Sequence, residues 1–300
     1  MNYHDPVMLA ECIEGLGIQQ NGIYVDVTFG GGGHSKAILD KLGGDGKLIA
    51  FDQDPDAEAN RIEDSRFTLV KDNFRNMAEQ LQTRNSLPVN GILADLGVSS
   101  HQFDVAERGF SIRFEHNMDM RMDTRSGITA LEILNTYSEK ELVNIFSNYG
   151  EVKNSKTLAA VIVQKRNKQP YSNSAELRSA IASLVPKANE NQYLAQVYQA
   201  LRIEVNDEMA ALRDLLEQSA QILDKGGRLV VMSYHSLEDR MVKNFISKGN
   251  FEGEDHKDIF GNSEGVLFKQ ITKKPIVPSQ EEIKMNPRSR SAKLRIAEKL

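Results

Sequence analysis

Residues 23–54 constrain the fold of this chain more than any other segment, because they predict a strand, a glycine turn, a helix and a second strand. Residues 24–27 and 48–51 are short apolar runs, typical of buried parallel strands. The four glycines at 30–33 permit a turn with positive φ, and they let backbone N–H groups approach a ligand without interference from a Cβ atom. The apolar residues within 35–42 have the spacing of one face of a helix. We therefore predict the first βαβ unit of a doubly wound α/β sheet, whose ligands bind beyond the carboxyl ends of the strands.

The glycine turn distinguishes two classes of nucleotide-like ligand. A dinucleotide fingerprint needs a third glycine where this chain has Ser35. The series D-x-T-x-G-x-G at 26–32 instead resembles the first motif of S-adenosylmethionine (SAM) methyltransferases. SAM carries no pyrophosphate, so its loop can dispense with that glycine. Asp52, at the end of the second strand, suits the ribose hydroxyls of either ligand. The turn favours SAM, with an NAD-type oxidoreductase as the alternative.

Composition narrows the class of protein. The chain has 300 residues, of which 40% are hydrophobic, enough for a sizeable core in one large domain or two. Without an apolar run long enough to span a membrane, and without a signal-peptide pattern, we expect a cytoplasmic protein with no membrane contact. Cys12 is the single cysteine and no Cys/His pair has zinc spacing, so we expect neither a disulfide framework nor a metal site. A net charge of −5 argues against general nucleic-acid binding but permits a local basic patch.

Two further predicted strands deliver side chains to the same edge of the sheet. Phe74 follows the strand at 67–70, where its ring could pack on an adenine or belong to the core. Asp95 follows the strand at 91–94, which in a doubly wound sheet lies beside the first strand at the switch point. Asp95 should therefore face both cofactor and substrate. A structural capping role is the weaker alternative, because the residues after Asp95 are not a helix start.

A fifth strand at 228–232 and a basic tail complete this half of the chain. His235 follows that strand at its carboxyl edge, and Ser236 could cap the next helix. The tail at 286–295 could be disordered or could bind phosphate.

The middle of the chain is predicted to be helical from about residue 127 to 199. Ser138 and Glu141 have the spacing of a capping box. We predict an inserted all-helical substrate-recognition domain at 113–202, between the parts of a methyltransferase domain at 1–112 and 203–300.

Six unusual blocks occur in order along the chain. They are TFGGGGHS at 28–35, DLGVSS at 95–100, ERGFS at 107–111, DMRMD at 119–123, HSLEDR at 235–240 and NPRSRS at 286–291. Together these blocks resemble one family, the bacterial 16S ribosomal RNA cytosine-N4 methyltransferases (RsmH or MraW family). The resemblance covers nearly the whole chain.

This resemblance implies SAM-dependent methylation of the exocyclic N4 of one cytidine in the decoding region of 16S rRNA, with the assembled small subunit as substrate. It also implies a Rossmann-like class I SAM methyltransferase sheet with a helical insert. We expect a monomer or a homodimer. The family's SAM contacts correspond to Gly32, Gly33, His34, Asp52, Phe74, Asp95 and Gln102.

The chemistry needs a group that orients the amine and a route for its proton. The N4 lone pair is delocalised into the ring, so an acceptor at its N–H and an in-line geometry are the main requirements. Asp95 and His235 are our candidates for orienting the amine or relaying its proton. The residues expected to hold the RNA strand are Arg108, Phe110, Arg121, Arg288 and Arg290.

Other functions stay open from the residues alone. A non-enzymatic ribosome assembly factor would leave the cofactor pocket unused. A methyltransferase acting on DNA or protein would share the SAM loop, although the block at 95–98 lacks the two prolines usual in DNA amino-methyltransferases.

Overall fold

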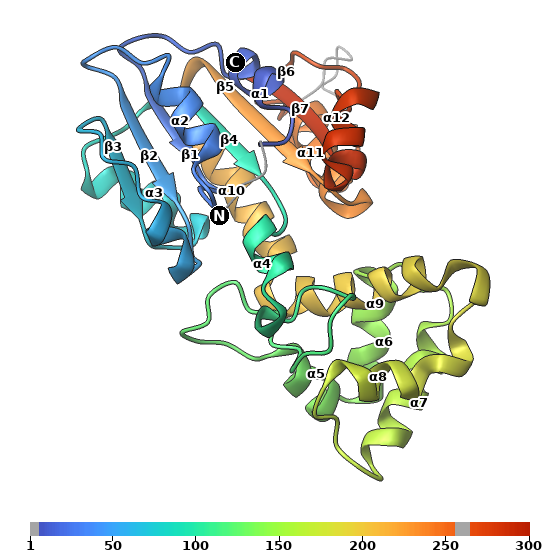
Figure 1. Cartoon of the computed structure of the whole chain (residues 1–300). Helices are drawn as coiled ribbons and strands as arrows, with labels where there is room; N and C mark the ends of the chain where they lie inside the picture. The colour runs from blue at the N-terminus through green and yellow to red at the C-terminus, as the bar shows by residue number, and fades with distance from the viewer. Residues whose placement is uncertain (1–5, 256–264) are drawn as a thin grey trace. The chain divides into compact units, whose positions relative to one another are not determined.

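The computed structural model describes residues 6–255 and 265–300. It divides the chain into two compact units, one running up to Gly97 and resuming at Ala210, the other spanning Val98–Met209 (Figure 1). That an insert at 113–202 recognises the substrate stays a prediction.

The first unit is built on a twisted sheet. Among the described residues, seven strands form it in the order β3-β2-β1-β4-β5-β7-β6. Strands β1 to β5 run parallel, whereas β7 pairs antiparallel with both β5 and β6. The predicted doubly wound sheet is confirmed. Its strands are β1 (Ile23–Asp26), β2 (Lys47–Phe51), β3 (Phe67–Val70), β4 (Val89–Asp95), β5 (Leu223–Ser233), β6 (Phe268–Gln270) and β7 (Lys293–Lys299).

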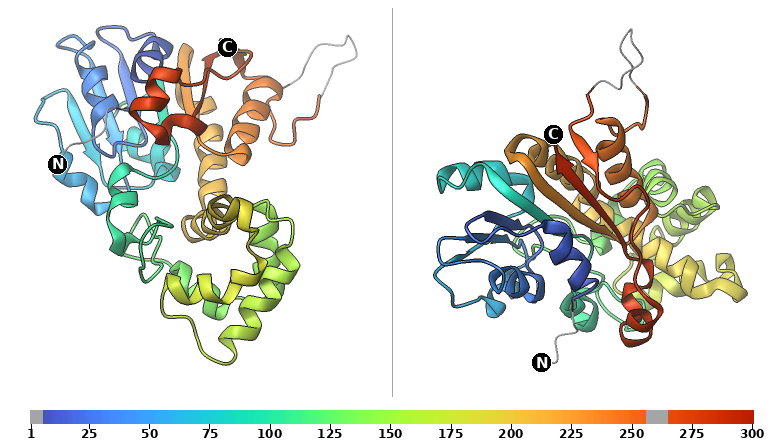
Figure 2. Two further views of the ribbon diagram at one scale, coloured as in Figure 1. Left: turned by 45° about the vertical axis from the view of Figure 1, so that its right-hand side comes forward. Right: turned by 90° about the horizontal axis from the view of Figure 1, so that it is seen from above.

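Helices cover both faces of this sheet (Figure 2). Alternate strand residues point to opposite faces, so the sheet has two cores. Val25, Ile92 and Val231 belong to the core with α3, α10 and α11, whereas Leu93 and Val230 belong to the core with α1 and α2. The helices are α1 (Leu9–Leu16), α2 (Gly33–Leu39), α3 (Met77–Thr83), α10 (Glu208–Ile222, in this unit from Ala210), α11 (Ser236–Lys248) and α12 (Gln280–Met285), with 3₁₀ turns η1 (Pro55–Asn60), η2 (Phe74–Asn76) and η6 (Pro287–Ser291).

The second unit is helical and has its own apolar core. The capping box at Ser138 and Glu141 is confirmed at the start of α6. None of the helices in the described residues is both long and apolar enough to cross a membrane. The elements of the second unit are α4 (Ser100–Asp104), η3 (Ala106–Arg108), α5 (Ala130–Thr136), α6 (Glu139–Asn148), α7 (Ser155–Arg166), α8 (Ser174–Ile181), η4 (Ala182–Leu184), η5 (Lys187–Asn189) and α9 (Glu190–Asn206).

The start of α10 differs from the one that the local residue types suggest. Asn206 has the residue type of an N-cap for the helix after it, but it is the last residue of α9, and Asp207 with φ 48° separates the two helices. The Asn206 side chain is used elsewhere, because its Oδ1 accepts the N–H of Met122 at 2.7 Å and its Nδ2 donates to the carbonyl of Met120 at 2.8 Å.

Leu93 tests the packing of the central sheet. Its side chain is 0% exposed in β4, so replacement by alanine should lower the free energy of unfolding by about 2–5 kcal/mol. The matched control is Leu267→Ala, because Leu267 is 38% exposed. Urea unfolding followed by circular dichroism measures both changes, and similar losses for the two variants would contradict the assigned core.

Candidate functional site

Asp26, the last residue of β1, holds the glycine turn through hydrogen bonds. Its side chain is 1% exposed, and its carboxylate accepts the Ser35 Oγ–H at 2.7 Å and the Thr28 N–H at 3.1 Å. Burial raises the pKa of Asp26, while these donors act in the opposite direction. Ser35 occupies the position where a dinucleotide fingerprint has its third glycine, and here its hydroxyl secures the turn.

Asp52 ties the turn to the end of β2. One carboxylate oxygen accepts the Gly30 N–H at 2.8 Å, and the other accepts the Asp54 N–H at 2.8 Å. Burial raises the pKa of Asp52 to about 6. Each oxygen retains a further acceptor position, so the carboxylate fits a ligand that donates ribose hydroxyls.

The glycines of the turn serve two different purposes. Gly32 has φ +76°, a left-handed conformation that favours glycine. Gly33 lacks that conformation, but a Cβ atom added to it would lie 2.2 Å from the Cγ atom of Pro6. The missing side chain of Gly33 therefore lets the segment at residues 6–8 pack on the turn.

His34 and Asp95 face each other at the carboxyl ends of the strands. His34 is buried, with its Nε2 3.2 Å from the carbonyl oxygen of Val7 and its Nδ1 3.9 Å from Asp95 Oδ2. The Asp95 N–H donates to Thr28 Oγ1 at 2.8 Å, which joins the end of β4 to the turn. Burial raises the pKa of Asp95 to about 6, against the opposing effects of His34 and of the Tyr234 hydroxyl.

Tyr234 is the residue that sequence reasoning missed. Its hydroxyl donates to Asp95 Oδ1 at 2.8 Å, and burial together with the Asp95 charge raises the tyrosine's pKa well above its usual value. A signal was available, since Tyr234 directly follows β5 and β5 lies beside β4.

His235 has a clear local function. The prediction that Ser236 caps α11 was wrong, because His235 is the N-cap and forms a capping box with Glu238. The Glu238 N–H donates to His235 Nδ1 at 3.4 Å, and Glu238 Oε2 accepts the Tyr234 N–H at 2.9 Å. These bonds fix the backbone that presents Tyr234. A proton-relay role for His235 stays a prediction.

Phe74 lies on η2 at the end of β3. It is half-buried and packs against the core on the α3, α10 and α11 face, so one part of the ring is structural and another part is accessible. The neighbouring Asn73 donates from Nδ2 to Gln53 Oε1 at 2.7 Å, which links the ends of β3 and β2. An adenine contact of Phe74 stays a prediction.

The remaining predicted residues occupy other environments. Gln102 lies in the second unit, in a capping box with Ser99. Arg108 and Phe110 are buried there, and the Arg108 Nη2 donates to the Arg121 carbonyl at 3.0 Å. The Arg121 guanidinium pairs with Asp119 at 2.7 Å. In the first unit, Arg288 is half-buried and Arg290 exposed on η6. Their roles in RNA binding stay predictions.

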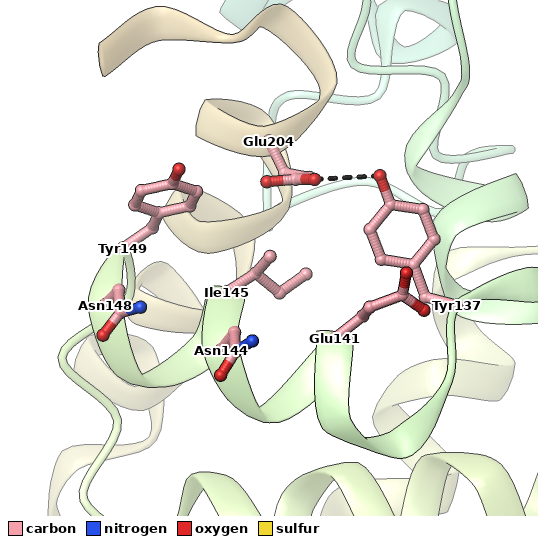
Figure 3. Close-up of a pocket in the computed structure, with 7 residues that line it drawn as sticks. All are labelled: Tyr137, Glu141, Asn144, Ile145, Asn148, Tyr149 and Glu204. Atoms are coloured by element: carbon pink, nitrogen blue, oxygen red, sulfur yellow. Dashed lines mark hydrogen bonds between the residues drawn. The ribbon is translucent and has the colours of Figure 1, made fainter. Parts of the chain in front are cut away.

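The second unit also contains a pocket of about 210 Å³ (Figure 3). Its polar groups are largely engaged, because Glu204 accepts the Tyr137 hydroxyl at 2.8 Å and Glu141 caps α6. Burial and the bond to Glu204 raise the pKa of Tyr137 to about 12. Two carboxylates do not suit the phosphates of a nucleic acid. The lining residues are Tyr137, Glu141, Asn144, Ile145, Asn148, Tyr149 and Glu204.

Comparison with known proteins gives one consistent family. The model of the MraW methylase family matches residues 1–300. The chain is 55% identical over 300 residues to a ribosomal RNA small subunit methyltransferase H from Flavobacterium johnsoniae, covering 100% of this chain and 99% of the relative. It is 53% identical over 299 residues to the protein of that name from Bacteroides thetaiotaomicron, covering 100% and 98%. A solved rRNA methylase from Streptococcus thermophilus aligns over 97% of this chain and 93% of that chain at 15% identity with a TM-score of 0.41, which adds no weight to the sequence match.

Gly33 provides a test of the contact between the turn and residues 6–8. Gly33→Ala places a methyl group against the Pro6 ring, so it should lower the free energy of unfolding by about 1–3 kcal/mol. Gly44→Ala is the control, because a Cβ there meets nothing within 4 Å. Thermal and urea unfolding measure both, and a Gly33→Ala protein as stable as the control would refute the contact.

Proposed function

Because this chain belongs to the MraW methylase family, we propose that it methylates small-subunit ribosomal RNA with SAM, at the exocyclic N4 of one cytidine in the decoding region of the assembled subunit. The observation that carries this proposal is the match over the full length of curated relatives named for small-subunit rRNA methylation. A substrate of that kind also implies action in the cytoplasm.

The donor site suits SAM because its polar groups converge on the glycine turn. Gly32, His34 and Asp52 would hold the cofactor, with Asp52 accepting from ribose hydroxyls. Phe74 lies on η2 after β3, the strand next to β2. Bound SAM supplies a methyl group on a positively charged sulfur. Asp26 holds a turn that has Ser35 in place of the third glycine. SAM has no pyrophosphate, so its binding does not need that glycine.

Asp95 is the group best placed to act on the amine. It ends β4, next to β1, and its Oδ1 is held by Tyr234. A carboxylate that accepts one amine N–H raises the electron density on nitrogen and aligns its lone pair with the methyl group, so orientation provides much of the rate. The same carboxylate can take up the proton that the amine loses.

The target base must leave its stack to reach this edge of the sheet. Arg288 and Arg290, close together on η6, are suited to phosphates of the surrounding strand. The family resemblance adds Arg108, Phe110 and Arg121 from the second unit, although burial of Arg108 and Phe110 favours a supporting role there.

The substrate proposal is tested by methyl transfer from labelled SAM. Small subunits from a strain lacking this gene and naked 16S rRNA serve as parallel substrates, followed by nucleoside analysis. We expect N4-methylcytidine on the assembled subunit and little on naked rRNA. Efficient transfer to naked rRNA would refute the assembled-subunit part. SAM binding without transfer to either RNA would refute the rRNA target and favour another substrate.

Asp95 should make the reaction pH-dependent. Its pKa of about 6 means that the carboxylate fraction, and with it the single-turnover rate at saturating SAM, rises with pH through about 6 and then levels off. Asp95→Asn should lower the rate by about 10²–10⁴-fold and remove this inflection.

Tyr234→Phe is the matched variant for that profile. It deletes the hydroxyl that lowers the pKa of Asp95, so the inflection should move to higher pH. His34, Asp26 and Glu238, which also influence the pKa of Asp95, are unchanged in this variant. An unshifted profile would show that Asp95 does not control the step.

A further inference from the structure

Residues 6–8 connect the glycine turn to the C-terminal part of the first unit. The Met8 N–H donates to Glu282 Oε1 at 2.7 Å, a contact between residues 274 positions apart in the sequence. Met8 has φ 49°, a left-handed conformation uncommon for a residue with a side chain, and its own side chain is buried. The segment is thus held by a specific bond at one end.

The other end of the segment reaches the proposed catalytic edge. Pro6 packs on Gly33, and the Val7 carbonyl lies 3.2 Å from His34 Nε2. A carbonyl oxygen can only accept, so Nε2 must carry the proton of the neutral ring. Nδ1 is then the nitrogen with the lone pair, and it is the one that faces Asp95 at 3.9 Å.

This arrangement lets the His34 ring accept a proton without breaking its existing bond. Protonation at Nδ1 leaves the Nε2–H to Val7 intact and turns the contact with Asp95 into an attractive ion pair. Asp95 keeps its second oxygen on the Tyr234 hydroxyl throughout.

We propose that Glu282 is a positioning residue, which holds residues 6–8 so that His34 presents Nδ1 to Asp95 and the two side chains together take up the proton of the methylated amine. This inference rests on the proposed function. Glu282 lies on α12, directly before the turn η6 that carries Arg288 and Arg290, so the segment that we assign to RNA also supports the proton acceptor.

The proton and electron count is complete with these groups. The amine nitrogen forms a bond to the methyl carbon while the sulfur–methyl bond breaks, and that bond's electron pair stays on sulfur. The nitrogen then loses one proton and keeps the N–H electron pair. The Asp95 carboxylate receives this proton and passes it to His34 Nδ1, which lies 3.9 Å from Asp95 Oδ2 and must move closer for the transfer.

The test compares variants of neighbouring residues on α12. Glu282→Ala removes the acceptor for the Met8 N–H and should slow single-turnover methyl transfer at saturating SAM by about 10-fold through misplacement of His34. The dissociation constant for SAM should change less than the rate. Glu282→Gln retains an acceptor oxygen and should stay close to wild type. Glu281→Ala, at an exposed position of the same helix, is the control.

Two kinetic outcomes would overturn the inference. One is a Glu282→Ala rate equal to that of Glu281→Ala, and the other is a Glu282→Gln rate as low as that of Glu282→Ala, because the bond to Met8 requires an acceptor and no charge. Wild-type protein assayed in parallel separates this result from a failure of the proposed function, which would leave wild type inactive on small subunits as well.

A second measurement needs no variant in the segment. Nitrogen-15 spectra of histidine-labelled wild-type protein report which ring nitrogen carries the proton, with the His34 signal assigned by its loss in His34→Gln. In spectra of the neutral ring we expect the Nε2–H tautomer. A neutral Nδ1–H form would refute the inference, even if the Glu282→Ala protein failed to fold.

Discussion

The site depends on the hydrogen bonds that the buried carboxyl group of Asp26 accepts from the glycine turn. An ionised group removed from water is costly unless hydrogen bonds compensate it, and here the donors are Thr28 and Ser35 from the turn itself. The carboxylate therefore stabilises one conformation of the turn. Thr28 extends the network, because its Oγ1 accepts the Asp95 N–H. Through these contacts, the buried carboxyl group of Asp26 places both the end of β1 and the end of β4.

Asp52 and Asp95, two carboxylates at the same edge of the sheet, are held in different ways. Asp52 uses backbone N–H groups from both sides of the turn, and it remains able to accept from a ligand. Asp95 is supported by Tyr234, whose backbone is in turn fixed by the capping box of His235 and Glu238. Asp52 lies just after β2, whereas Asp95 and Tyr234 lie where β4 meets β5.

Charged residues in the loop at 107–123 show how ambiguous a local pattern can be. An arginine near an aromatic ring is typical of an RNA contact, and it is equally typical of a loop held by its own side chains. In the structure, Arg108 donates to the backbone of Arg121, and Arg121 pairs with Asp119 two residues away. Their first function is to order the loop, because bonds between near neighbours form at little entropic cost.

The sequence by itself determined the doubly wound sheet, the glycine turn, the strand-end positions of Asp52, Phe74 and Asp95, and the family. Periodicity, glycine placement and block order are local properties, so they can be read without coordinates. Only the tertiary structure decided that Tyr234 holds Asp95, that His235 caps α11, and that Glu282 binds Met8. The bonds of Tyr234 and Glu282 join side chains to groups on another strand or at the opposite end of the chain, so their geometry depends on how the elements pack. The cap of α11 is a local bond, but the sequence pattern favoured Ser236 for it.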